Sequence, residues 1–332
     1  MTEEKRIDWI DVLKGWGIIL IVIGHMPIPS VLREWVFSFH VPLFFFVSGY
    51  LYKPGKYSFK EWIFRKSKSL LIPYLFFMVL CFATNYFVLG KDVGSMIPKW
   101  IIRGCGGWPI WFLYVLFLSE LLGDFIYKVT KGKNTPLLLI SLFFAAFSYW
   151  CYLGGLHLPY KLEVVGISTL YFIVGIIIRQ NKLFSFFAKP ICSNNIAHFL
   201  AIVFLLVIDV ICAKAIIPDL NMIDNKLGIH LPTLCLAIIG IYLSIQISLW
   251  LMPHDRLVRL FKYAGENSII ILGVSSPIWL TLLTIMKCVP ISMYIRIPLI
   301  LIFMVGGIIL AIYMINNYLP FVIGRKKIQS KK

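Results

Sequence analysis

The stretch WIDVLKGWGIILIVIGHM, residues 9–26, is an apolar segment of membrane-spanning length that carries Asp11, Lys14 and His25. On an α-helix Lys14 and His25 lie within roughly 20° of each other, and Asp11 lies about 40° away on the same stripe. Ionisable side chains inside a membrane span are costly, and by default they face a bundle interior or a wet cavity. A lone histidine could simply bond a neighbouring helix. Three polar residues on one stripe favour a functional site.

The composition is that of a polytopic membrane protein. Of the 332 residues, 60% are hydrophobic and 14% are charged, whereas a soluble domain is about half apolar and a quarter charged. The N-terminal flank MTEEKR has mixed charge, and no small-residue cleavage site follows the apolar run. We therefore expect the first segment to be a retained helix and not a cleaved signal peptide.

The hydropathy pattern predicts an all-α integral membrane protein. We expect one transmembrane domain over residues 1–332, with about ten helices in a single bundle around a central cavity. Each apolar segment is near the ~20 residues that a bilayer requires. The expected spans are 12–30, 34–52, 69–89, 108–127, 136–154, 164–180, 195–213, 231–252, 266–286 and 295–317.

Loop charges predict the orientation of this bundle. Of the 32 Lys and Arg residues, 22 fall on one set of alternating segments, which includes both termini, and 9 fall on the other; Lys14 lies within a span. The positive-inside rule therefore places both termini in the cytoplasm. The net charge of +17 is then mostly an attraction to anionic lipid head groups. No basic nucleic-acid module is recognisable, so nucleic acid is not an expected partner.

Other chemistries lack their motifs. The seven cysteines are scattered, without a Cys-x-x-Cys pair or a Cys/His cluster, so neither a disulfide framework nor a metal site is expected. The glycines at 104–107 lack the Lys and Ser/Thr of a P-loop.

Three further stretches could carry chemistry. In segment 37–49, FSFHVPLFFFVSG, His40 is either a wet interfacial residue or part of a site, and Ser48-Gly49 could allow close helix approach. Segment 65–73, RKSKSLLIP, is either an inside-positive signal or a phosphate clamp that uses Arg65 and Lys68. Glu120 lies near the middle of its predicted span, where a carboxylate is unusual.

These stretches together resemble membrane-bound acyltransferase family 3, especially its short members of the fucose 4-O-acetylase-like kind. The resemblance runs from the first span to the ninth. The residues that carry it are IDVLKGWGIILIVIGH (10–25), FHVPLFFFVSGYLY (39–52), RKSKSLLIPY (65–74), WFL (111–113) and GENSIIILG (265–273).

The resemblance implies transfer of an acyl group, usually acetyl from acetyl-CoA, onto a hydroxyl of a cell-surface glycan or its lipid-linked precursor. It implies His25 as the catalytic residue and Lys14 as its paired basic residue. Arg65 and Lys68 form the second basic pair, and Ser48 belongs to a pore-lining motif. It also implies a multi-pass protein of the cytoplasmic membrane, in a bacterium.

A mechanism follows from the helix geometry. Lys14 and His25 are about 16 Å apart along a straight helix, so a long donor must bridge them. Lys14, Arg65 and Lys68 would hold the CoA phosphates at the cytoplasmic mouth. His25 would act as general base, or would carry the acyl group as a nucleophile. Asp11 and Glu120 are further candidate catalytic residues, with Glu120 orienting the imidazole.

Two features depart from the family pattern. Many members carry a histidine shortly after the GENS-like motif, where this chain has Ser275. Some members also carry a fused extracytoplasmic hydrolase-like domain. This chain ends soon after its last expected span, so we expect the bundle to complete the reaction alone or with a separate partner.

Two other classes of function remain open. A transporter or flippase for an anionic or glycan-linked solute would also need intramembrane polar residues and a basic inner mouth. A lipid-binding assembly subunit for surface-polysaccharide synthesis is the third possibility. Only the acyltransferase would consume the thioester in a His25-dependent reaction.

Overall fold

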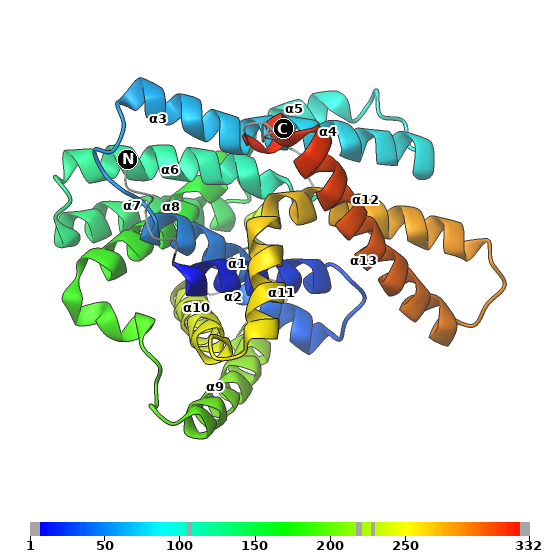
Figure 1. The fold of residues 1–332 in the computed structure, drawn as a ribbon. Coiled ribbons are helices and arrows are strands. Elements are labelled where there is room, and N and C mark those ends of the chain that lie inside the picture. The colour runs from blue at the N-terminus through cyan, green and yellow to red at the C-terminus, as the bar shows by residue number, and fades with distance from the viewer. Residues whose placement is uncertain (1–6, 105–107, 217–220, 227–229, 326–332) are drawn as a thin grey trace, which may run out of the picture. The chain divides into compact units, whose positions relative to one another are not determined.

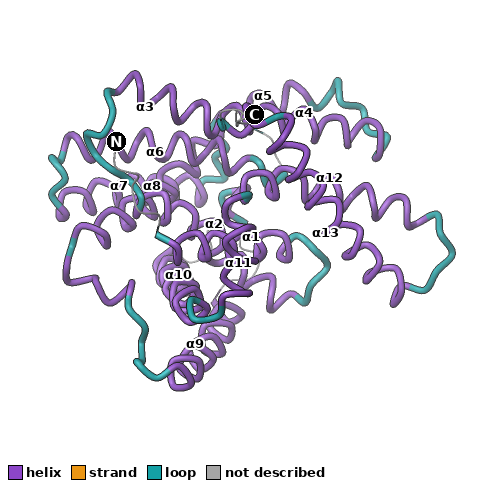
Figure 2. Tube along the Cα trace, in the orientation of Figure 1, coloured by secondary structure: helices purple, strands orange, loops and turns teal. Residues whose placement is uncertain are grey.

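The structure, a computed structural model, describes residues 7–104, 108–216, 221–226 and 230–325. Within these residues the regular structure is helical, apart from a single isolated bridge between Asn221 and Lys226. The tube in Figure 2 shows helices joined by short loops. The expectation of an all-α protein is therefore confirmed.

All ten expected spans are helices in the structure. Their bounds are α1 Asp8–Gly24, α2 Ser30–Tyr50, the run Phe59–Val88, α6 Trp111–Val129, α7 Asn134–Leu153, α8 Leu162–Gln180, α9 Asn195–Ile216, α10 His230–Leu251, α12 Ser268–Lys287 and α13 Met293–Tyr318. The run consists of α3 Phe59–Lys66, η1 Ser67–Leu71, α4 Ile72–Ala83 and η2 Thr84–Val88. The other elements are α5 Ile97–Arg103, η3 Pro159–Lys161, η4 Lys182–Ala188, η5 Met222–Asp224, α11 Asp255–Glu266 and η6 Pro320–Ile323.

Eight helices of the described chain are long and apolar enough to cross a membrane, so the chain is a multi-pass membrane protein. The two expected spans outside this group are α1 and α6. Helix α1 has only 17 residues, and α6 carries Glu120, Asp124 and Lys128 within its length. The number of ten spans therefore stays a prediction.

The first helix ends earlier than its hydropathy indicates. We expected a span over 12–30 with His25 deep inside it, but α1 ends at Gly24 and His25 is its C-terminal cap. Pro27 and Pro29 explain the difference, because proline lacks an N–H and disfavours helical geometry at the preceding residue. His25 thus lies at the C-terminal end of α1 and not in its middle.

The chain forms two compact units that alternate along the sequence. The first contains residues 1–54, 118–157 and 162–268, and the second contains 55–117, 158–161 and 269–332. Helices α1, α2 and α7–α11 belong to the first unit, together with most of α6. The second unit holds α3–α5, α13 and nearly all of α12.

Helix α2 is the centre of packing in the first unit, where it contacts α1, α8, α9 and α10. Its Phe39 is fully buried and belongs to a core cluster with Leu20 of α1 and Ala213 of α9. Helix α11 packs against α1 and crosses it in Figure 1. Because α2 contacts both α1 and the helices that follow it, side chains on α2 can face the end of α1.

Small residues allow α2 and α8 to touch along their backbones. A Cβ added at Gly49 would lie 1.8 Å from the carbonyl oxygen of Phe172, and one added at Gly175 would lie 2.2 Å from that of Phe46. Close backbone approach through glycine is the usual way in which membrane helices gain packing energy. The expectation that Ser48-Gly49 permits close helix approach is thus confirmed.

Within the second unit, a π-helical turn interrupts the long helical run. The turn, η1, covers Ser67–Leu71 and stands just before Pro73. A proline lacks the N–H that a regular helix needs, and a π-turn is one way to absorb that loss. Lys68 therefore lies on locally widened helix, close to Gly324 near the end of the described chain.

The α2–α8 contact generates a stability prediction. Gly49→Ala should lower stability by about 1–3 kcal/mol, because the new methyl group meets a carbonyl that cannot move without shifting α8. Thermal unfolding of the purified protein in detergent measures this. Gly306→Ala on α13 is the matched control, because nothing lies within 4 Å of its Cβ position. Equal melting temperatures for the two variants would contradict the prediction.

Candidate functional site

His25 is held by the helix that precedes it. Its Nδ1 lies 2.7 Å from the carbonyl oxygen of Ile21. A carbonyl oxygen accepts hydrogen bonds and cannot donate one, so Nδ1 carries the proton. In the neutral ring the other nitrogen, Nε2, is then the basic atom. The backbone of α1 therefore fixes the tautomer that a general base needs.

A second histidine and an aromatic ring lie against His25. The Phe37 ring is 5.5 Å from the His25 ring and 4.8 Å from the His40 ring, and the two imidazoles are 6.4 Å apart. His40 is buried, and its Nδ1 lies 2.7 Å from the carbonyl oxygen of Val36. His40 is thus not a wet interfacial residue, and both imidazoles present the same tautomer.

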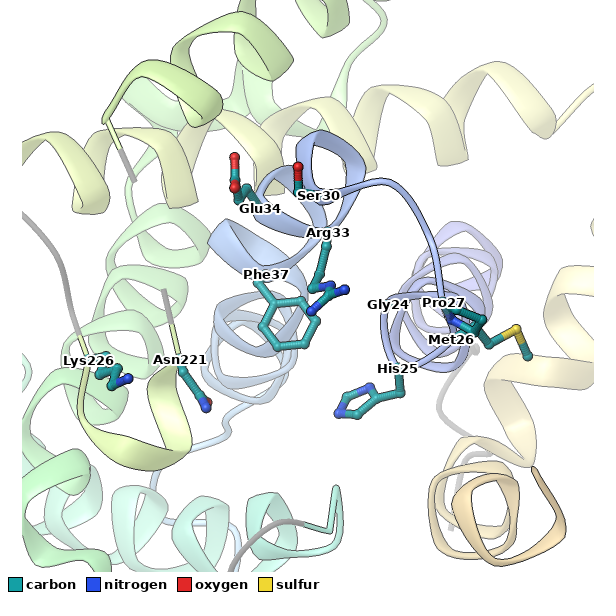
Figure 3. A pocket seen from close by; sticks show the side chains of 10 residues that line it. All are labelled: Gly24, His25, Met26, Pro27, Ser30, Arg33, Glu34, Phe37, Asn221 and Lys226. Atoms are coloured by element: carbon teal, nitrogen blue, oxygen red, sulfur yellow. The ribbon is translucent and has the colours of Figure 1, made fainter. Parts of the chain in front are cut away.

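His25 faces a polar cavity of about 600 Å³ within the first unit. Figure 3 shows the imidazole directed into the open space, with Arg33 and Phe37 of α2 facing the same space and the segment that holds Asn221 and Lys226 on the opposite side. The lining residues are Gly24, His25, Met26, Pro27, Ser30, Arg33, Glu34, Phe37, Asn221 and Lys226. The volume suits a small molecule.

Ser48 and Glu120 form a pair between α2 and α6. The Ser48 hydroxyl donates a hydrogen bond to the buried carboxylate of Glu120. This contact lies towards the C-terminal end of α2, whereas His25 contacts Phe37 and His40 in its first half. The structure therefore pairs Glu120 with Ser48 of segment 39–52, whereas the imidazole of His25 is oriented by a hydrogen bond between its Nδ1 and the Ile21 carbonyl.

Two ion pairs mark the N-terminal end of α1. The Lys14 ammonium lies 2.9 Å from the buried carboxylate of Asp11, which confirms that these residues share a stripe. Lys262 of α11 donates to Asp8 at 2.6 Å, and this hydrogen bond raises the pKa of the Lys262 ammonium. Two lysines and two aspartates thus form ion pairs towards the end of α1 opposite to His25.

Arg65 and Lys68 belong to the second unit. The Arg65 guanidinium donates twice to Glu61, through Nε at 3.1 Å and Nη2 at 3.0 Å, and it lies 4.3 Å from the centre of the Tyr57 ring. Lys68 lies in the π-turn. Ser275, at the position where many family members have histidine, is buried in α12 of the same unit.

The cavity contains residues that sequence reasoning did not select. From the sequence, Arg33 and Lys226 count only as loop charges, and Glu34 and Asn221 have no assigned role. The sequence feature that could have indicated these cavity residues is the presence of charged side chains just beyond the ends of apolar segments. Within the described residues, no three His, Cys, Asp or Glu side chains gather closely enough to hold a metal ion.

The family model of the acyltransferase 3 family, an acyltransferase domain, matches residues 7–316. The chain belongs to this family. The match spans both compact units and confirms the resemblance carried by the motifs. Comparisons with curated proteins and with solved structures gave no match. The protein is therefore a membrane acyltransferase, and the cavity beside His25 is the candidate site of this acyltransferase.

The Ser48–Glu120 contact generates a second stability prediction. Ser48→Ala removes a donor from a buried carboxylate, which should destabilise this acyltransferase by roughly 1–3 kcal/mol. Ser48→Thr keeps the hydroxyl and should retain most of the stability. Urea or thermal unfolding in detergent measures both variants. If the alanine variant were as stable as the wild type, the buried hydrogen bond would not contribute to the fold.

Proposed function

We propose that the protein is a membrane O-acyltransferase that moves an acyl group, most simply acetyl, from acyl-CoA to a hydroxyl of a cell-surface glycan or lipid-linked sugar. The observation that supports this most is the His25 ring. Its Nδ1 is bonded to the Ile21 carbonyl, and the ring faces a polar cavity large enough for a sugar. Membership of the acyltransferase 3 family favours this reaction class over transport.

The proposed step is a proton-coupled attack on a thioester. His25 Nε2 accepts the proton of the acceptor hydroxyl while the oxygen forms a bond to the thioester carbonyl carbon. The C–S bond then breaks, and the CoA thiolate receives the proton from the imidazolium. The products are the ester and free CoA, so no further reactant is required. In the alternative route His25 carries the acyl group transiently, before the sugar oxygen displaces it.

The proposed donor path starts at the cytoplasmic side, where the loop charges place both termini. Lys14 binds CoA phosphate there, and Asp11 positions the Lys14 ammonium through its 2.9 Å ion pair. Arg65 and Lys68 are kept as the second basic pair that the sequence predicts for the donor phosphates. The pantetheine arm covers the roughly 16 Å between Lys14 and His25. Ser48 lies along this path, and Glu120 acts through its hydrogen bond to that hydroxyl.

In the topology proposed here, the cavity lies on the outer side of the cytoplasmic membrane of a bacterium. Helix α1 leads from the inner face to His25, and α2 returns from Ser30, so the cavity lies at the outer ends of both helices. A sugar destined for the cell surface would reach it from that side. Donor and acceptor would thus enter from opposite faces and meet at one imidazole.

His25→Ala should reduce acyl transfer by about 10²–10⁴-fold, the usual contribution of a general base. Membranes that contain the protein are incubated with radiolabelled acetyl-CoA, and labelled glycan and free CoA are both measured. His157→Ala is the matched control, since His157 is exposed and lies outside the cavity lining. A transporter would leave the thioester intact, and transfer that persisted in the His25 variant would contradict the proposed role.

Arg65→Gln and Lys68→Gln should each raise the KM for acetyl-CoA by about tenfold, because a charge-assisted contact to phosphate is worth roughly 1.5–3 kcal/mol. The kcat should change little, since these residues do not touch the reacting atoms. Arg259→Gln, at an exposed position of α11, serves as a charge-matched control. Unchanged KM values in both variants would remove the second basic pair from the donor site.

A further inference from the structure

We propose that Arg33 and Lys226 together bind an anionic group of the acceptor, so that the substrate class is an acidic or phosphate-bearing sugar. This inference rests on the proposed acyltransferase function. The anionic group is either the phosphate of a lipid-linked precursor or the carboxylate of an acidic sugar, and both present the same oxygen chemistry to Arg and Lys.

The charge of the cavity lining supports an anionic ligand. Arg33 and Lys226 come from different elements yet line the same space as His25 (Figure 3). Glu34 is the one carboxylate among the ten lining residues. With His25 neutral, the lining therefore carries an excess of one positive charge. Cations that line one concave site attract and orient an anion.

Backbone hydrogen bonds stabilise the loop that carries Lys226. Asn221 and Lys226 form a two-way backbone bridge, with N···O distances of 3.1 Å and 2.9 Å. Between them, η5 makes one tight turn and Asn225 adopts a left-handed conformation with φ 54°. The bridge fixes the backbone of Lys226, from which its side chain extends at the edge of the cavity.

The same loop is anchored to the helices of the first unit. The buried Asn225 side chain donates a 3.1 Å hydrogen bond to the backbone carbonyl of Ser148 in α7. Met222 of the loop is also buried. This hydrogen bond compensates the burial of the amide and holds the loop against α7.

The spacing on α2 sets where the anion would lie. Arg33 and Phe37 are four residues apart, so they share one helix face and are separated by about 6 Å along the axis. Phe37 contacts His25, with ring centres 5.5 Å apart. A sugar that rests its apolar face on Phe37 would present a hydroxyl to His25, and its anionic group would lie one helical turn further out, at Arg33.

The CoA phosphates are the competing occupant of these cations. Lys14, the donor residue of the first unit, lies near the opposite end of α1 from His25. A single donor molecule that places phosphates at Lys14 and its thioester at His25 would not also place phosphates at Arg33. The kinetics of the two substrates separate these possibilities.

The test uses lipid-linked glycans extracted from cells that naturally make the protein, titrated at saturating acetyl-CoA. Arg33→Gln and Lys226→Gln should each raise the KM for the glycan by about tenfold, while kcat and the KM for acetyl-CoA stay within twofold. Lys214→Gln is the matched control. It removes an exposed charge near the C-terminal end of α9 in the same unit, and Lys214 does not line the cavity.

Two treatments of the glycan identify the anion. Mild acid releases the sugar from its lipid phosphate, and carbodiimide amidation neutralises carboxylates. The treatment that removes the bound anion should raise the wild-type KM to the level of the two variants and leave the variants unaffected. In the wild type, inorganic phosphate or glucuronate should compete with the glycan and not with acetyl-CoA. This inhibition test does not depend on any variant folding.

Specific outcomes overturn the proposal. If the KM for the glycan were equal in all variants, or if neither treatment changed the wild-type KM, the cavity would not bind an anionic group of the acceptor. A rise in the KM for acetyl-CoA instead would assign Arg33 and Lys226 to the donor. These results differ from a failure of the proposed function, in which the wild type itself would transfer no acetyl group and His25→Ala would change nothing.

Discussion

The constraint on which this structure depends is that hydrocarbon offers no hydrogen-bonding partner to a polar group. The segments expected to span the membrane are helices, which satisfy the backbone internally. The buried imidazole of His40 follows the same rule, because its Nδ1 hydrogen-bonds the carbonyl of Val36, four residues earlier on α2. His25, which is exposed to the cavity, makes the matching hydrogen bond to the carbonyl of Ile21. At His25 the bond to the Ile21 carbonyl selects the tautomer on which the proposed chemistry relies.

Buried carboxylates in the first unit obey the same constraint with side-chain partners. Asp11 takes an ammonium, Glu120 takes a hydroxyl, and Asp209 of α9 takes the indole N–H of Trp35 at 2.9 Å. In the first two pairs one partner belongs to a stretch that carries the family resemblance, Lys14 or Ser48, and in the third the partner is the core aromatic Trp35. The polar residues that mark the family in the sequence are therefore part of the packing, which ties the stability of the bundle to the geometry of the site.

Much of the fold could be predicted, because the length and spacing of apolar runs determine where membrane helices form. The end of α1 was misplaced because hydropathy does not register the prolines after His25, although their lack of an N–H ends the helix. Helix α11 was not expected, since its charged residues lower its mean hydropathy.

The stripe of Asp11 and Lys14 could be predicted from helical periodicity. The Ser48–Glu120 pair and the cavity could not, because they join elements that are far apart in sequence.

The rigid turn after α1 has a consequence for recognition. Pro27 lines the cavity and Pro29 precedes α2, and each has its φ angle fixed by its ring. The edge of the cavity beside His25 therefore has little conformational entropy to lose when a ligand arrives, which makes this wall preorganised. Selectivity at this edge would then arise from the shape and charge of the ligand, with no closing movement of the wall itself.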